Sequence, residues 1–317
     1  MGEKNCYELT NPQKSIWNME EYFKGTTINN ICAPEIIYEK IDPKVLKKAL
    51  NNLVKKNDAF RIQIELQNGV PMQYITEYKP FEIEVVHIKN EEDVKKIEED
   101  GITHRFEIIN SALYYFKIFI MENGCGGFVI TAHHLISDSW SMGLVAKGAL
   151  EEYHSLINKE ELPLTDTSYI QYIEAEKEYK QSKKHEADKE YWNTMFENIP
   201  EQATIPGSKK AFKEFSCDGK REIFWLDEDI VKRMNAFCSK NKISAFNFLM
   251  AIYAIYLGRV SNIKEFVIGT PILNRANYRE KQTMGMFINS VPVKINIKDE
   301  ESFAFFSHTI GKNMLGN

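Results

Sequence analysis

The chain has 317 residues, of which 43% are hydrophobic and 27% are charged. These proportions are typical of a globular protein and exclude collagen-like and wholly disordered classes. The 40 basic and 45 acidic residues give a net charge of −5, which argues against a dedicated nucleic-acid binder and against docking on anionic lipid. At about 150 residues per domain, the length suits one large domain or two domains of medium size.

The cysteines and the N-terminus predict a cytoplasmic location. The five cysteines are scattered, and no two have the CxxC spacing of a zinc or redox site, so we expect reduced thiols. The N-terminal MGEKNCYELT has no apolar signal core, and the most apolar stretch, residues 246–257, is too short to span a bilayer. We therefore expect no membrane partner.

The first predicted elements are a helix and a strand. Asp42 is placed to cap a helix over residues 43–56, whose leucines form one apolar stripe. Residues 60–66, FRIQIEL, alternate between apolar and polar side chains, which predicts a strand with one buried face. The alternation puts Arg61 on the face opposite Phe60.

Residues 113–121 and 127–134 flank a turn-rich NGCG and predict a β-hairpin. The second of these strands is apolar on both faces, so we expect it inside a sheet, followed by a helix over 141–157. The later part of the chain predicts a charged helical region at 169–192 and a loop at 200–219, which is the best domain boundary.

After this loop the sequence predicts a strand at 221–226, a helix at 227–240, an apolar helix capped near Ser244, and two strands, FVIGTP and FINSVPVKINI. Helices and strands are thus mixed along the whole chain, which indicates an α/β or α+β class with layered sheets.

The chemistry concentrates in residues 131–143, TAHHLISDSWSMG. Neighbouring residues of a regular strand point to opposite faces, so His133 and His134 cannot both face one cleft. One imidazole is expected to face a substrate and carry a proton, and the other to belong to the scaffold. The alternative interpretation is that the histidine on this apolar strand is a buried core residue without a catalytic role.

Other chemistries lack their signatures. A metal site is not expected, because HExxH is absent and His134 with Asp138 is a thin ligand set. A GxSxG nucleophile elbow and a Walker A lysine motif are also missing, and the glycines near residue 126 lie between two strands.

The segment from His133 to Ser141, HHLISDSWS, resembles the HHxxxDGWS motif of the condensation domains of nonribosomal peptide synthetases. Further segments are similar to family motifs in the family's order: LTNPQKSIW (9–17), KNDAFR (56–61), YIQYI (169–173), YW (191–192), VIGTP (267–271) and MGMFINSVPV (284–293). The resemblance covers nearly the whole chain.

This resemblance implies a chloramphenicol-acetyltransferase-like fold of α/β (two-layer α+β) class, with two lobes in a V around a tunnel. It places the N-terminal lobe with the HHxxxD motif at residues 1–175 and a partial C-terminal lobe at 176–317. It implies amide-bond formation in the biosynthesis of a secondary metabolite such as an antibiotic, by attack of a carrier-bound aminoacyl amine on a carrier-bound donor thioester. The implied partners are donor and acceptor peptidyl carrier proteins with an adjacent adenylation domain. No cofactor is expected beyond the 4′-phosphopantetheine arms that carry the substrates.

The resemblance also implies roles for individual residues. His134 matches the catalytic histidine, as general base or as a group that positions the amine. Asp138 is expected to be structural and to pair with Arg61, while His133 belongs to the scaffold. Trp140 is expected in the core and Ser141 as a helix cap. The further candidates for lining the site are Ser139, Trp140, Ser141, Gly143 and Asn289.

The chain departs from the family at Ser139, where the family has glycine, and at Asn57, where it has histidine. The chain stops at Asn317, where family members continue, so we expect an incomplete second lobe and impaired catalysis. The order Trp140-Ser141 disfavours an epimerisation domain, and the two histidines disfavour a heterocyclisation domain. A stand-alone HxxxD acyltransferase and a catalytically silent carrier-docking module remain as alternatives.

Overall fold

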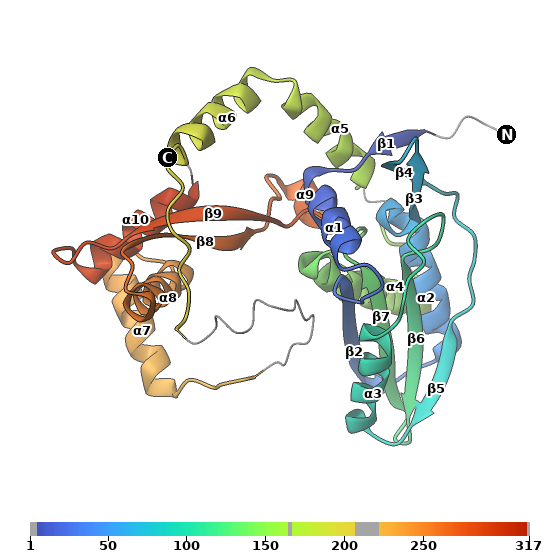
Figure 1. The fold of residues 1–317 in the computed structure, drawn as a ribbon. Coiled ribbons are helices and arrows are strands. Elements are labelled where there is room, and N and C mark those ends of the chain that lie inside the picture. The colour runs from blue at the N-terminus through green and yellow to red at the C-terminus, as the bar shows by residue number, and fades with distance from the viewer. Residues whose placement is uncertain (1–4, 164–166, 207–221, 316–317) are drawn as a thin grey trace. The chain divides into compact units, whose positions relative to one another are not determined.

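The computed structural model describes residues 5–163, 167–206 and 222–315. The chain forms two compact units, each discontinuous in sequence (Figure 1). The first unit comprises Met1–Glu186 and Leu273–Asn289, and the second comprises Ala187–Ile272 and Ser290–Asn317. We call Leu273–Asn289 the return segment, because it brings the chain back to the first unit.

This division differs from the one expected between residues 175 and 176. The boundary in the structure falls within a helix, α6 (Lys183–Met195), and the return segment leaves the second half of the sequence. Much of the predicted boundary loop, residues 207–219, lies outside the described residues.

The elements of the first unit follow the chain in this order: β1 (Cys6–Glu8), α1 (Asn11–Tyr22), β2 (Asn30–Lys40), α2 (Pro43–Lys56), the 3₁₀ helix η1 (Asp58–Arg61), β3 (Ile62–Gln67), β4 (Val70–Ile75), β5 (Glu84–Ile88), the 3₁₀ helix η2 (Glu91–Asp93), α3 (Val94–Ile102), β6 (Tyr114–Met121), β7 (Cys125–His133), α4 (Ser139–Asn158), α5 (Tyr169–Lys180) and, in the return segment, α9 (Tyr278–Gln282).

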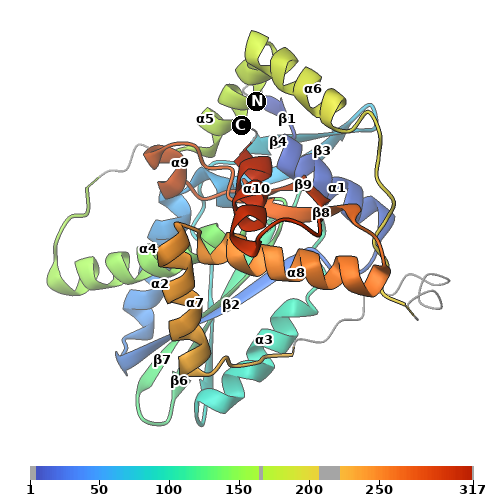
Figure 2. The same ribbon diagram turned by 90° about the vertical axis from the view of Figure 1, so that its left-hand side faces the viewer.

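A four-stranded sheet in the order β2-β7-β6-β5 carries the site at one end of β7. The expected hairpin is confirmed, since β6 and β7 pair antiparallel from Tyr114–Ala132 to Ile120–Gly126. Helices α2 and α4 cover one face of this sheet and α3 covers the other (Figures 1 and 2). Strand β7 is therefore buried on both sides, which is why both of its faces are apolar.

Strand β3 and helix α4 each begin two residues away from the predicted position. Residues 58–61 form the 3₁₀ turn η1, so Arg61 precedes β3 and does not follow its alternation. Helix α4 begins at Ser139 with Asp138 as its N-cap, because the Asp138 carboxylate accepts a hydrogen bond from the amide of Ser141. The expectation that Ser141 caps this helix is therefore wrong.

The second unit contains α7 (Glu228–Asn241), α8 (Ala245–Ser261), β8 (Glu265–Ile272), β9 (Asn289–Asn296) and α10 (Phe303–Leu315). Strands β8 and β9 form a two-stranded sheet, and α8 and α10 share an apolar core with it. The strand expected at 221–226 is not found over Glu222–Leu226, where Phe224 and Trp225 are largely exposed. Residue 221 lies outside the described part of the chain.

Candidate active site

His133 ends strand β7, and its buried ring is bound to protein on both nitrogens. The amide of Leu135 donates to Nδ1 at 3.1 Å, so Nδ1 carries no proton. The proton therefore sits on Nε2, which lies 3.3 Å from Oε2 of Glu20 on helix α1. These contacts fix one neutral tautomer of His133.

His134 follows β7 and is only half-buried. Its Nδ1 lies 3.1 Å from the carbonyl oxygen of Ser137, and a carbonyl only accepts, so Nδ1 carries the proton. Nε2 then holds the free lone pair, and none of the described residues forms a hydrogen bond with it. Burial lowers the pKa of His134 below its usual value, against a smaller opposing effect of the Ser137 carbonyl. The ring is therefore a neutral base near pH 7.

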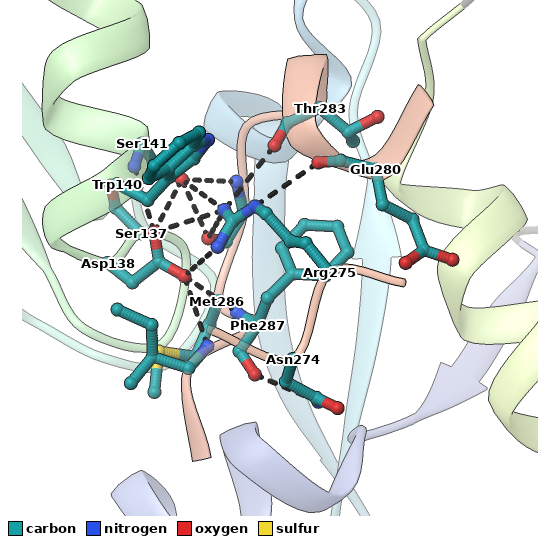
Figure 3. A network of polar contacts seen from close by, with 12 residues as sticks. Ser137, Asp138, Trp140, Ser141, Asn274, Arg275, Glu280, Thr283, Met286 and Phe287 are labelled. Carbon is teal, nitrogen blue, oxygen red and sulfur yellow. Dashed lines mark hydrogen bonds and ion pairs between the residues drawn. The ribbon is translucent and has the colours of Figure 1, made fainter. Parts of the chain in front are cut away.

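Asp138 has no exposed side-chain surface and accepts six hydrogen bonds (Figure 3). The donors are the Ser141 amide and hydroxyl, Nη1 and Nη2 of Arg275, and the amides of Phe287 and Ile288, at 2.8–3.1 Å. Burial alone would raise the pKa of Asp138, but the Arg275 guanidinium and these amides outweigh it and lower the pKa. Asp138 is thus an ionised structural anchor, and it does not bind the ring of His134.

Arg275, in the return segment, is the cation of this site. Its two terminal nitrogens hold the Asp138 carboxylate at 2.8 and 3.1 Å, and its Nε donates to the carbonyl of Glu280 at 3.2 Å. The guanidinium also stacks on the ring of Phe287, with its carbon 4.1 Å from the ring centre. The side chain of Arg275 accordingly has no exposed surface.

Three further contacts tie the return segment to the rest of the first unit. Nε1 of Trp140 donates to the Lys281 carbonyl at 2.9 Å, and the Tyr169 hydroxyl donates to the Met286 carbonyl at 2.6 Å. The Ser141 hydroxyl, which donates to Asp138, accepts the amide of Gly285 at 3.0 Å. Together with the Asp138–Arg275 pair, these bonds give the segment one defined path beside α4.

The predicted pairing of Asp138 with Arg61 is wrong. Nη1 of Arg61 donates to the carbonyl of Thr76 at 2.8 Å, at the end of β4, while Arg275 occupies the Asp138 carboxylate. The reason is local: Arg61 ends the turn η1, and both its side chain and its backbone carbonyl are bonded to Thr76.

The remaining predicted site residues have different surroundings. Ser139 and Gly143 lie exposed on the first turns of α4, and Trp140 is 41% exposed, so the expectation that Trp140 is a core residue is wrong. Ser141 is fully buried in the Asp138 network. Asn289 ends the return segment and begins β9.

Three residues of this region, Arg275, Glu20 and Gln13, were not predicted from the sequence. Gln13 lies in the segment that resembles the opening family motif, and its Nε2 donates to the Leu135 carbonyl at 2.9 Å. The one available signal for Arg275 was its place between the motif-like segments at 267–271 and 284–293.

The described residues contain no group of three or more His, Cys, Asp or Glu side chains that could hold a metal ion. No single helix among them is long and apolar enough to cross a membrane, and only the pair α7 and α8, bent by 105°, meets that test when joined.

Solved structures define the class of fold. The first condensation domain of the calcium-dependent antibiotic synthetase aligns over 98% of this chain and 74% of its own, with a TM-score of 0.83 and 18% identity. The condensation domain of the monacolin K polyketide synthase aligns over 98% and 73%, with a TM-score of 0.84 and 17% identity. The expected α/β, chloramphenicol-acetyltransferase-like fold is confirmed.

Residues 3–316 match the family model of the condensation domain, so the chain belongs to the condensation-domain family. It is 33% identical to surfactin synthase subunit 1 of Bacillus subtilis over 314 residues, and 28% identical to a plipastatin synthase subunit of the same organism over 316 residues. The alignments cover 96% and 98% of this chain but only 9% and 12% of those synthases. The resemblance drawn from the motifs is therefore confirmed.

Proposed function

We propose that the chain forms an amide bond between two carrier-bound substrates, with His134 receiving the proton of the attacking amine. The proposal is supported by membership of the condensation-domain family and by the similarity to subunits of peptide synthases. The observation that carries it is the tautomer of His134, whose Nδ1 is held by Ser137 while Nε2 keeps its lone pair.

The reaction balances without an added cofactor. The acceptor's amine nitrogen attacks the carbonyl carbon of the donor thioester, the new C–N bond forms and the C–S bond breaks. The nitrogen releases a proton to Nε2 of His134, and that proton then neutralises the departing phosphopantetheine thiolate of the donor carrier. A thioester is already reactive, so holding both ends together accounts for much of the rate.

The proposed partners are donor and acceptor peptidyl carrier proteins, together with an adenylation domain that loads them. The proposed location of the reaction is the cytoplasm. Asp138 and His133 serve as the frame that places His134, since both are buried and each binds protein through both polar atoms of its side chain. Trp140, Ser139 and Gly143 lie next to this frame on the start of α4 and are candidates for contact with substrate.

The test supplies a donor-loaded and an acceptor-loaded carrier to the protein and measures dipeptidyl-carrier by mass spectrometry. For His134→Ala we expect a rate about 10²–10⁴-fold below that of the wild type, the usual range for general base catalysis. His154→Ala is the matched control, because His154 is exposed on α4.

Three results would contradict this function. A rate for His134→Ala equal to that of the wild type removes the proposed base. Turnover of a free acyl thioester with a free amine, but not of loaded carriers, indicates a stand-alone HxxxD acyltransferase. Binding of loaded carriers without product, in the wild type and His134→Ala alike, indicates a docking module.

A further inference from the structure

Helix α1 presents two polar side chains to the turn that carries His134. Gln13 and Glu20 are two helical turns apart and so lie on the same side of α1. Gln13 binds the carbonyl of Leu135, and Glu20 lies against the ring of His133. The residues before and after His134 are thus both held by one helix.

Glu20 also reaches His134 by a second path. Its Oε2 accepts a hydrogen bond from Nδ2 of Asn29 at 2.8 Å, and the backbone carbonyl of Asn29 accepts the amide of His134 at 2.8 Å. Asn29 is 2% exposed, His133 is 3% exposed and the Glu20 side chain is 16% exposed. One carboxylate oxygen therefore orders two buried groups, and both are bonded to the backbone that carries His134.

We propose that Glu20 is a positioning residue for His134, acting through the ring of His133 and the amide of Asn29. The inference rests on the function proposed above for His134. Glu20 touches neither the ring of His134 nor its Nε2, so its effect is on where that nitrogen is held.

The contact suits an ionised carboxylate. Two N–H groups converge on the same oxygen, Oε2, and a carboxylate accepts both as charge-assisted hydrogen bonds without offering a donor of its own. The hydrogen bond from His133 is the main cause that lowers the pKa of Glu20, against the opposing effect of burial. With the Leu135 amide on the other side, the carboxylate leaves His133 a single tautomer, protonated on Nε2.

The test uses Glu20→Ala, which removes the acceptor, and Glu20→Gln, which keeps the size but removes the charge. Glu21→Gln is the matched control, since it makes the same charge change on the exposed side of α1. The first readout is the tautomer of each ring in ¹⁵N-histidine-labelled protein, with His133→Gln and His134→Gln variants to assign the signals. The second is kcat and KM in the carrier assay.

In the wild type we expect opposite tautomers, Nε2–H for His133 and Nδ1–H for His134. In Glu20→Ala we expect the signals of both rings to shift from those of the wild type, and kcat to fall about 10–100-fold with KM changed by less than about threefold. Glu20→Gln should shift the His133 signals in the same direction, and it decides the question if Glu20→Ala does not fold. Glu21→Gln should match the wild type in every measurement.

The proposal is overturned if the His134 signals of both Glu20 variants match the wild type, or if kcat falls no further than in Glu21→Gln. The tautomer measurement requires no turnover. A wild type without condensation activity would therefore remove the proposed function, while the His134 signals would still show whether Glu20 positions that ring.

Discussion

Asp138 and Arg275 lie 137 positions apart in the sequence and meet in a two-bonded ion pair with no exposed side-chain surface. The pair joins the N-terminal cap of α4 to the return segment. Removing one partner would leave the other charge buried without compensation, which costs far more than the pair itself contributes.

Substitution of Arg275 should therefore destabilise the fold strongly. We expect Arg275→Met to lower the free energy of unfolding by about 3–5 kcal/mol, measured by urea denaturation. Lys14→Met is the control, because Lys14 forms an exposed pair with Glu8 and should cost at most about 1 kcal/mol. A loss for Arg275→Met no larger than for Lys14→Met would contradict the structural role of the pair.

A double-mutant cycle should separate the true partner of Asp138 from the one suggested by the family motif. Asp138→Asn and Arg275→Met contact each other, so we expect their effects on unfolding to be non-additive by about 0.5–3 kcal/mol. Asp138→Asn and Arg61→Met share no bond and should add within about 0.5 kcal/mol. Coupling with Arg61 as large as with Arg275 would show that the network is wrongly assigned.

The contribution of Asp138 should depend on pH. Its pKa is lowered in the folded protein, so its stabilising effect is complete above the unfolded value of about 3.9 and is lost as pH falls through the folded value. We expect the stability gap between the wild type and Asp138→Asn to be constant from pH 7 to about 5 and to narrow below about pH 4. A gap that stays constant down to pH 2 would contradict the lowered pKa.

The imidazole of His134 should stay neutral under mildly acidic conditions. Burial lowers the pKa of His134 in the folded protein below the unfolded value of about 6.5. At a pH between the folded and the unfolded pKa, the unfolded chain takes up the proton more readily than the folded protein does. The free energy of unfolding therefore falls as the pH drops through this range. We expect an NMR titration of the His134 Cε1–H signal, assigned with His134→Gln, to have its midpoint below pH 6.5. A midpoint at or above 6.5 would show that the ring is not buried as described.

Two glycines offer a matched pair of substitutions. A Cβ on Gly285, whose φ is +146°, would lie 2.2 Å from Cδ2 of the fully buried Tyr169 ring. Gly285→Ala should therefore cost about 1–3 kcal/mol from overpacking, in addition to backbone strain. Gly143, in the helix α4, has no heavy atom within 4 Å of its Cβ position, and Gly143→Ala should stabilise the fold by up to about 1 kcal/mol. Equal melting temperatures of the two variants would contradict this packing.

Local patterns predicted the first unit well. The hairpin, the buried strand β7 and the helix capped by Asp42 each depend on residues a few positions apart, and each is confirmed. Asp42 caps α2 as expected, because its carboxylate accepts the amides of Lys44 and Val45.

The frame around His134 could not be predicted in the same way. Its bonds join residues that are distant in sequence, such as Asp138 with Arg275 and Gln13 with Leu135. No periodicity or spacing in one sequence encodes such a contact. The family resemblance implied a structural role for Asp138 but suggested the wrong arginine, because Arg61 closes a 3₁₀ turn instead of continuing a strand.

The path of the return segment has a consequence for synthesis on the ribosome. Domains usually fold as units while the chain emerges, the N-terminal part first. Here the first 186 residues include Asp138, but the cation that neutralises it and two of the three amides that hold it, those of Phe287 and Ile288, are made 137–150 residues later. The first unit therefore cannot reach its final structure until the chain has been translated past Asn289, and most of the second unit must leave the ribosome before the first one is complete.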